Sequence, residues 1–209
     1  MIDEGYIKYQ CNWIKSEPID INKIAELNEW RNKLYKLGLI GEYENGIGFG
    51  NISIRDSQPK QFIVSGTQTG NLPVLNQQHY TTVTEFDLEK NSLTCCGPIK
   101  ASSESLTHAT LYQTDPEVNA IIHVHNLELW QKLMYKVPTT EKNVSYGTPE
   151  MAKEIIRLFK QDNLINTKNT KILVMSGHEE GIISFGTDLE EAANILLDRY
   201  NEYICAKAN

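Results

Sequence analysis

Residues 120–126 read Ala120-Ile121-Ile122-His123-Val124-His125-Asn126, a short run of β-branched and apolar residues that ends in a polar one. Such a run predicts a buried β-strand. Side chains two residues apart on a strand point to the same face, so His123 and His125 are expected to stand side by side. Two imidazoles in this arrangement can bind one metal ion, and the strand is therefore the first candidate for a functional site.

Two further residues could complete a metal site. His178 lies in Met175-Ser176-Gly177-His178-Glu179-Glu180-Gly181, and Glu104 lies in Ser102-Ser103-Glu104-Ser105. Three histidines and one carboxylate are a suitable ligand set for a catalytic zinc ion, with the carboxylate able to give up its place to a substrate. The alternative for Glu104 is an ordinary acidic residue at the start of a helix.

Composition narrows the class of protein. The chain has 209 residues, of which 40% are hydrophobic and 22% charged, as expected for one globular enzyme domain spanning residues 1–209. A net charge of −7 without a basic stripe argues against a nucleic-acid partner, but it leaves room for a small anionic ligand. The four cysteines form no CxxC pair, which favours reduced thiols and a cytoplasmic location. The acidic N-terminus does not resemble a signal peptide, and no apolar run is long enough for a membrane span.

The pattern of apolar residues predicts alternating helices and strands without a linker. Asp20 and Gly38 mark the ends of a first helix, Thr148-Pro149-Glu150 starts another, and Asp188 with Glu191 predicts a capping box for the last. Helices are expected at 21–37, 103–114, 127–133, 149–160 and from 189 onward, and strands at 51–55, 61–64, 82–86, 93–96, 120–125, 171–175 and 182–185. Early hairpin strands followed by strand–helix alternation indicate a mixed sheet with helices on both faces.

Three short motifs supply neutral hydrogen-bond donors. Gly50-Asn51 and Thr69-Gly70 are each typical of simple turns, and Ser102-Ser103 is typical of a helix cap. Together, however, an amide side chain, hydroxyl groups, an exposed glycine N–H and a helix N-terminus suit a phosphate-binding site.

These motifs occur in an order that resembles the class II aldolase/adducin family. The order is Gly50-Asn51-Ile52-Ser53, Thr67-Gln68-Thr69-Gly70, Ser102-Ser103-Glu104, His123-Val124-His125 and finally His178. The resemblance covers nearly the whole chain. It implies an α/β fold, a three-layer α/β/α sandwich with a central mixed, largely antiparallel sheet, and a homotetramer with active sites at subunit interfaces.

The resemblance also implies a role for each candidate residue. Glu104 would be the catalytic acid/base, or a metal ligand, and the metal would be Zn²⁺, although another divalent ion would fit the same ligands. The implied reaction is cleavage of a phosphorylated ketose through an enediolate, with the metal as Lewis acid. The metal would be held by His123, His125 and His178 with Glu104, and the substrate phosphate by Asn51, Thr69, Gly70, Ser102 and Ser103.

The chain departs from the aldolases of this family at several points. They have a catalytic tyrosine three residues before the aromatic residue of an aromatic-Gly-Thr turn, where this chain has Asn143. A tyrosine of the last helix, Tyr200 or Tyr203, could substitute across an interface, although core packing is the simpler interpretation. Glu179 and Glu180 lengthen the loop after His178; a solvated acidic turn is favoured over entry of one carboxylate into the site. His108, four residues after Glu104, is expected to pack rather than to orient Glu104.

Three classes of function follow from the sequence. A metal-dependent aldolase or related lyase is favoured by the complete metal and phosphate sets. A sugar-phosphate epimerase, dehydratase or decarboxylase of the same family is the second; the epimerase branch has Asp where this chain has Glu104, which counts against it. The third is a non-catalytic, adducin-like binding module, which would be expected to have lost metal ligands.

Overall fold

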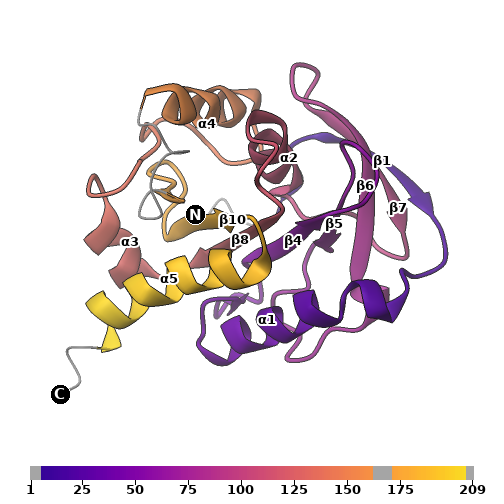
Figure 1. Cartoon of the computed structure of the whole chain (residues 1–209), viewed down its shortest axis with the longest axis horizontal. Helices are drawn as coiled ribbons and strands as arrows, with labels where there is room; N and C mark the ends of the chain where they lie inside the picture. The colour runs from indigo at the N-terminus through magenta and orange to yellow at the C-terminus, as the bar shows by residue number, and fades with distance from the viewer. Residues whose placement is uncertain (1–5, 162–170, 206–209) are drawn as a thin grey trace.

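The structure is a computed structural model that describes residues 6–161 and 171–205 (Figure 1). Its main sheet has the strand order β1-β7-β6-β5-β4-β8-β10-β9, and two short strands, β2 and β3, form a separate hairpin. No helix within the described ranges has the length and apolarity that crossing a membrane requires. The strands are β1 (Gln10–Lys15), β2 (Gly41–Glu42), β3 (Gly48–Phe49), β4 (Asn51–Arg55), β5 (Phe62–Ser65), β6 (Tyr80–Asp87), β7 (Ser92–Gly97), β8 (Ala120–His125), β9 (Ile172–Val174) and β10 (Gly181–Gly186).

The His-x-His strand β8 lies in the middle of the sheet. It pairs antiparallel with β4 on one side and with β10 on the other. The pairings from β7 across to β9 are antiparallel, whereas β1 runs parallel to β7. The expected mixed, largely antiparallel sheet is therefore confirmed.

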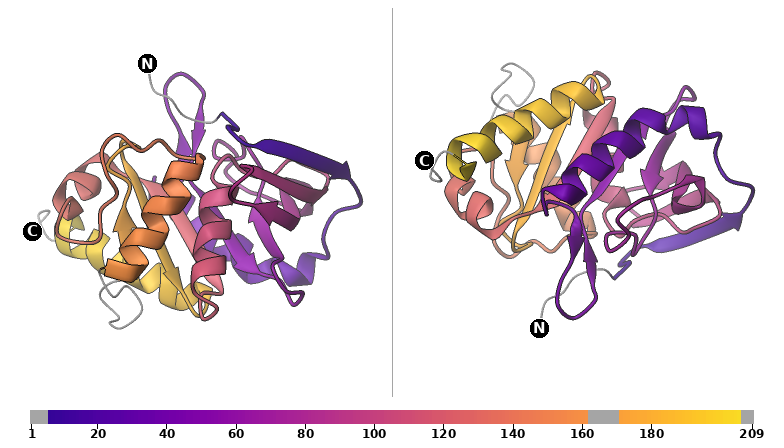
Figure 2. Two further views of the ribbon diagram at one scale, coloured as in Figure 1. Left: turned by 90° about the horizontal axis from the view of Figure 1, so that it is seen from above. Right: turned by 90° about the horizontal axis from the view of Figure 1, so that it is seen from below.

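Helices cover both faces of this sheet, so the expected three-layer α/β/α arrangement is confirmed (Figure 2). Helices α2 (Ser105–Thr114) and α4 (Pro149–Gln161) lie on one face. Helices α1 (Ala25–Lys36), α3 (Leu127–Leu133) and α5 (Leu189–Tyr203) lie on the other. Single-turn 3₁₀ helices occur at Ile21–Lys23 and Gln77–His79.

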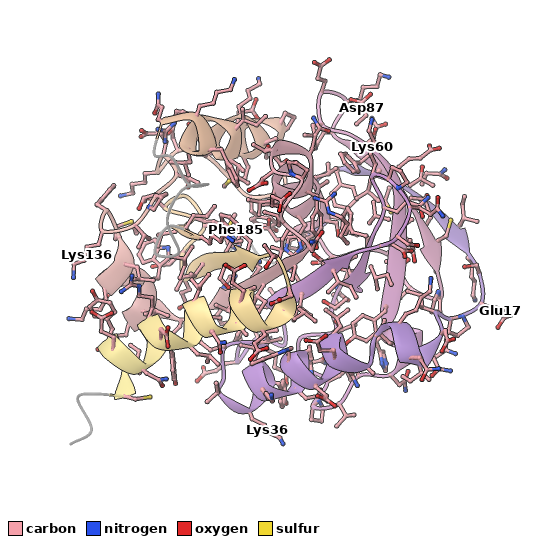
Figure 3. All side chains as sticks on the ribbon, viewed as in Figure 1. Glu17, Lys36, Lys60, Asp87, Lys136 and Phe185 are labelled. Atoms are coloured by element: carbon pink, nitrogen blue, oxygen red, sulfur yellow. The ribbon has the colours of Figure 1, made fainter. Side chains whose placement is uncertain are left out.

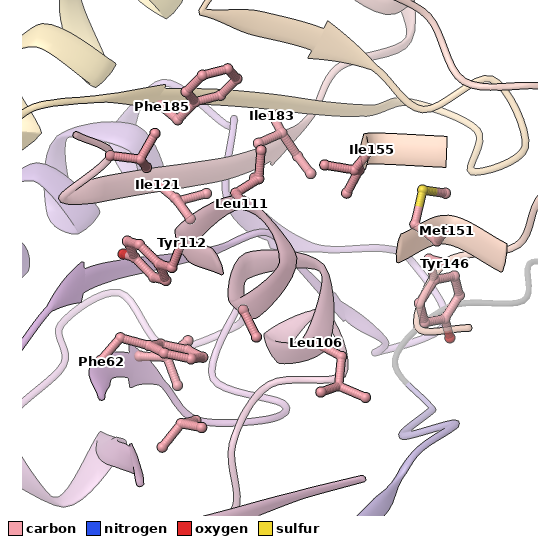
Figure 4. Close-up of a cluster of buried hydrophobic side chains, with 14 of the residues drawn as sticks. Phe62, Leu106, Leu111, Tyr112, Ile121, Tyr146, Met151, Ile155, Ile183 and Phe185 are labelled. Atoms are coloured by element: carbon pink, nitrogen blue, oxygen red, sulfur yellow. The ribbon is translucent and has the colours of Figure 1, made fainter. Parts of the chain in front are cut away.

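Each face has its own hydrophobic core. On the α2/α4 face, Ile121 of β8 packs in a cluster that includes Tyr112 and Ile155 (Figure 4). On the opposite face, the neighbouring Ile122 packs in a cluster that includes Leu27 of α1. Because side chains alternate along a strand, His123 and His125 share the face of Ile121 and lie under α2 and α4.

The side chains follow the same division between interior and surface. Phe185 of β10 is completely buried near the centre of the molecule, whereas Lys36, Lys60 and Lys136 point outward at its rim (Figure 3). Burying one face of each helix against the sheet is the main source of stability expected for such a fold.

Several predicted helix ends are confirmed. Asp20 accepts a hydrogen bond from the backbone N–H of Asn22, and Gly38 ends the segment with φ +69°, a conformation that glycine adopts without strain. The predicted first helix is divided, because the 3₁₀ turn precedes α1. Thr148 accepts a hydrogen bond from the N–H of Met151 at the start of α4.

Other local predictions were wrong. Helix α2 begins at Ser105, with Glu104 rather than Ser102 or Ser103 in the N-cap position and without a side-chain cap. Asp188 does cap α5, but the Glu191 carboxylate does not complete the capping box; it accepts hydrogen bonds from Thr187 and Lys171. Strand β1 was not predicted, because its residues are mostly exposed and lack a clear alternation of apolar residues.

Candidate metal centre and active site

Three histidines meet on the α2/α4 face of the sheet. His123 and His125 come from β8, and His178 comes from the loop between β9 and β10. One ring nitrogen from each of the three lies within 4.8 Å of the others, and the Nε2 atoms of His125 and His178 are 3.0 Å apart. All three side chains are buried. The expected triad is therefore brought together with its ring nitrogens close enough to share one ion.

The pairing of β10 with β8 carries His178 to this position. Gly181 lies opposite His125 in the register, so the loop before Gly181 turns back beside the His-x-His strand. A Cβ atom on Gly181 would be 2.4 Å from Cδ2 of His178. Glycine is thus needed directly after this loop to let the third imidazole pack against the backbone.

Glu104 lies beside the triad at the start of α2. Its Oε1 atom is 3.8 Å from Nε2 of His178, and its Oε2 atom accepts a hydrogen bond from the Thr107 hydroxyl at 2.5 Å. Within the described part of the chain, Glu104 Oε1 and His123 Nε2 are buried without a hydrogen-bond partner. Buried polar atoms without partners are costly. These two would gain a partner from a divalent cation, so the residues present fit a metal ion.

Burial sets the charge of these groups. It lowers the pKa of His123 to about 3, and it holds the pKa values of His125 and His178 well below the usual range. The three imidazoles are therefore neutral at physiological pH, which is the form that binds metals. Burial also raises the pKa of Glu104 to about 7. A carboxyl group with a pKa near neutrality can both accept and donate a proton, as an acid/base catalyst must.

The raised pKa of Glu104 predicts a pH-dependent effect on stability. Between the ordinary value of 4.5 and about 7, the folded metal-free protein keeps a proton that the unfolded chain has released, so Glu104 costs stability as pH rises through this window. Glu104→Gln removes this titration. The free energy of unfolding of the variant, relative to wild type, should therefore rise by roughly 2–3 kcal/mol from pH 5 to pH 8 in urea titrations. A constant difference would show that the carboxyl group titrates alike in both states.

The expected phosphate donors lie on three neighbouring segments. Asn51 stands opposite His123 in the β4–β8 pairing, with its Nδ2 atom 3.3 Å from Nδ1 of that histidine. A bridge between Gly66 and Ala101 joins the segment before Thr69 to the segment before Ser102. The five predicted residues, Asn51, Thr69, Gly70, Ser102 and Ser103, are all buried and lie on segments that adjoin Glu104 and the triad.

A buried arginine fixes the Thr69-Gly70 turn from within. One terminal nitrogen of Arg31, on α1, donates hydrogen bonds to the carbonyl oxygens of Thr69 and Gly70 at 2.8 and 3.1 Å. A Cβ atom on Gly70 would lie 2.3 Å from the carbonyl oxygen of Gly41. The turn is thus closely packed against the β2–β3 hairpin, and only glycine fits there.

One residue that contacts the triad carries no signal in the sequence, and it joins Glu180 to the site. Tyr43, in the β2–β3 hairpin, has its hydroxyl 2.7 Å from Nδ1 of His125, and it donates a hydrogen bond to Glu180 Oε2 at 3.0 Å. The interpretation of a solvated acidic turn holds for the exposed Glu179 but is wrong for Glu180, which is half-buried. No local signal in the sequence could have linked Tyr43 to residues so far along the chain.

The remaining candidates lie outside this cluster. The Nδ1 atom of His108 hydrogen-bonds the Ser53 hydroxyl at 2.7 Å, as expected for a packed histidine rather than a partner of Glu104. Asn143 is exposed. Tyr200 and Tyr203 pack against the core of the opposite sheet face, as the simpler interpretation predicted. Besides Tyr43, a second tyrosine that lies beside the triad is Tyr146, whose ring centroid is 4.6 Å from that of His178.

Comparison with known proteins identifies one family. The family described as Class II Aldolase and Adducin N-terminal domain matches residues 29–198. No curated protein sequence matches the chain. Among solved structures, an L-fuculose 1-phosphate aldolase aligns with a TM-score of 0.66 and 19% identity, over 91% of this chain and 89% of that chain.

Two other solved structures are similar over comparable lengths. A sugar-phosphate aldolase from Thermotoga maritima aligns with a TM-score of 0.62 and 18% identity, over 90% of this chain and 94% of its own. YgbL from Klebsiella pneumoniae, a candidate aldolase, epimerase or decarboxylase, aligns with a TM-score of 0.65 and 17% identity, over 91% and 92%. At such low identities these similarities establish the fold and leave the reaction open.

Proposed function

Because this chain belongs to the class II aldolase and adducin family, we propose that it is a metal-dependent lyase that cleaves a phosphorylated ketose. The observation that carries the proposal is the buried His123, His125 and His178 triad with Glu104 beside it. A non-catalytic binding module would have no need of three neutral imidazoles and a carboxyl group of raised pKa in one place.

The proposed reaction assigns a task to each group. His123, His125 and His178 would hold a divalent ion, with Zn²⁺ the first candidate for this ligand set. When bound, the ion supplies a Lewis acid for the carbonyl oxygen of the substrate. Cleavage of the adjacent C–C bond would release an aldehyde, with its hydroxyl proton passing to a second group, and would leave an enediolate. Glu104 in its protonated form would then deliver a proton to the enediolate carbon. Its burial excludes water from the proton transfer.

The same residues would support related reactions. Epimerisation, dehydration and decarboxylation can also pass through an enediolate. The residues therefore support a phosphorylated sugar as substrate more strongly than they support cleavage of one particular bond. Glutamate rather than aspartate at position 104 favours a lyase over an epimerase, since the resemblance associates the epimerase branch with Asp. We further expect a cytoplasmic homotetramer with active sites at its interfaces. In such an assembly a neighbouring subunit could supply the catalytic tyrosine that is replaced by Asn143 in this chain.

A screen of phosphorylated ketoses for cleavage tests the proposal. Purified protein loaded with Zn²⁺ is expected to release an aldehyde together with a phosphorylated three-carbon product, and the aldehyde identifies the sugar. Release of CO₂ or water, without an aldehyde, would reassign the reaction within the family. Absence of turnover on every substrate by a protein that retains its metal would contradict the proposed activity.

The phosphate site predicts a selective effect of Ser103→Ala. Removing one hydroxyl donor from the proposed anion site should raise KM for a phosphorylated substrate by about tenfold, because a hydrogen bond to a charged group contributes roughly 1.5–3 kcal/mol. KM for the unphosphorylated analogue should change little. Ser57→Ala, in the exposed turn after β4, serves as the control. An equal effect of Ser103→Ala on both substrates would contradict the phosphate role.

A further inference from the structure

His125 of the triad is contacted at its outer nitrogen by Tyr43, which in turn is hydrogen-bonded to Glu180. The hydroxyl of Tyr43 lies 2.7 Å from Nδ1 of His125, and it donates a hydrogen bond to Glu180 Oε2 at 3.0 Å. The three side chains come from the β2–β3 hairpin, from β8 and from the loop that also carries His178. This contact therefore joins three segments that are distant in the sequence.

The two nitrogens of His125 face opposite surroundings. Nε2 lies 3.0 Å from Nε2 of His178, inside the triad, whereas Nδ1 faces Tyr43. Because the Tyr43 hydroxyl hydrogen is donated to Glu180, the phenolic oxygen is left to accept the N–H of His125 Nδ1. This arrangement fixes the tautomer with the proton on Nδ1 and the lone pair of Nε2 directed into the triad.

The backbone at Glu180 provides a second, independent observation. This residue has φ +69°, in the left-handed region that glycine adopts freely and that a glutamate adopts only at a cost. Strained backbone of this kind persists where the surroundings hold it, and it is concentrated at functional sites. Here the strained residue is the one whose carboxylate reaches Tyr43.

Aromatic packing holds Tyr43 in place. Its ring centroid lies 4.7 Å from that of Phe49 on β3, and the Phe49 ring stacks on His125 with centroids 5.4 Å apart. Backbone hydrogen bonds from Tyr43 N to Ile47 O and from Gly46 N to Tyr43 O close the hairpin. The hydroxyl group of Tyr43 is therefore presented to His125 by a well-packed element.

From these contacts we infer that Tyr43 and Glu180 are positioning residues, which orient His125 as a ligand and raise the affinity of the triad for a divalent ion. The inference rests on the metal site of the proposed function. Partners that hydrogen-bond the outer nitrogen of a metal-binding histidine fix its ring and make it a better ligand, and their removal typically lowers metal affinity about 10- to 100-fold. Here a tyrosine stands between the carboxylate and the imidazole.

Zinc binding by the whole chain tests the inference without any assay of activity. The dissociation constant for Zn²⁺ is measured by competition with a chromogenic chelator for wild type, Tyr43→Phe and Glu180→Gln. Tyr43→Phe should bind Zn²⁺ about 10- to 100-fold more weakly. Glu180→Gln, whose amide oxygen can still accept from Tyr43 but carries no charge, should also bind Zn²⁺ more weakly than wild type. Glu179→Gln is the matched control, because its carboxylate is adjacent in sequence but exposed, and it should bind as wild type does.

A third variant separates positioning from a purely structural role. Glu180→Gly relieves the left-handed backbone, so the metal-free variant should melt at a higher temperature than wild type. Its affinity for Zn²⁺ should nevertheless fall as in Glu180→Gln. A gain in stability combined with a loss of metal binding is not expected if Glu180 serves only the fold.

The outcomes are distinguishable. If wild type binds Zn²⁺ and Tyr43→Phe and Glu180→Gln, folded as judged by circular dichroism, bind it equally well, the positioning role is overturned and the metal site stands. If wild type does not bind Zn²⁺, the metal-dependent function fails, and this inference fails with it.

Discussion

Glutamine in place of Glu104 should lower kcat for cleavage by about two to four orders of magnitude, because an amide cannot take up or return the proton that the reaction moves. The substitution keeps the size of the side chain and its capacity to accept a hydrogen bond from Thr107, so the fold should be retained. The exposed Glu150 on α4 offers a matched control, and Glu150→Gln should keep the kcat of wild type.

Two measurements decide how to interpret a loss of activity in Glu104→Gln. Exchange of the enolisable C–H proton with solvent should fall together with kcat, since exchange needs the base but no C–C cleavage. The metal content should stay at the level of wild type. Loss of the metal would show that Glu104 acts as a metal ligand. Unchanged exchange with the metal retained would place the base elsewhere.

The double variant His123→Ala/His125→Ala should lose both metal and activity. Elemental analysis of wild type is expected to find about one divalent ion per chain, and removal of two of the three imidazoles leaves too few ligands to hold it. His79→Ala is a suitable control, because this histidine lies in a 3₁₀ turn outside the triad and its ring accepts a hydrogen bond from Asn76 N–H. Full retention of the metal by the double variant would contradict the assignment.

The central part of the fold was predictable because its signals are local. The β-branched run of β8 and the Thr148-Pro149 start of α4 each specify their structure within a few residues. The same holds for the triad in part: the two-residue spacing of His123 and His125 follows from strand geometry alone. His178 could be named as a third candidate from its residue type, but its position beside the pair requires the long-range pairing of β10 with β8, which no local signal predicts.

The parts that were missed depend on contacts between distant segments. Strand β1 is defined by its parallel pairing with β7, and its own residues carry little β pattern. Tyr43 belongs to no motif in the sequence, and only the folded chain places its hydroxyl against His125 and the Glu180 carboxylate against that hydroxyl. Glu191 was assigned to a capping box from its spacing, yet the nearby Lys171 and Thr187 compete successfully for its carboxylate.

Arg31 has a consequence for the electrostatic potential around the Thr69-Gly70 turn. The guanidinium group holds two carbonyl oxygens inside the protein, and because the N–H of a peptide unit points away from its C=O, the N–H of Gly70 and that of Asn71 are turned away from the arginine. The two peptide dipoles thereby extend a positive potential to the far side of the turn, where the guanidinium group itself makes no contact. An anion bound there would be attracted by a full cationic charge that it never touches, and the arginine would stay shielded from solvent and salt.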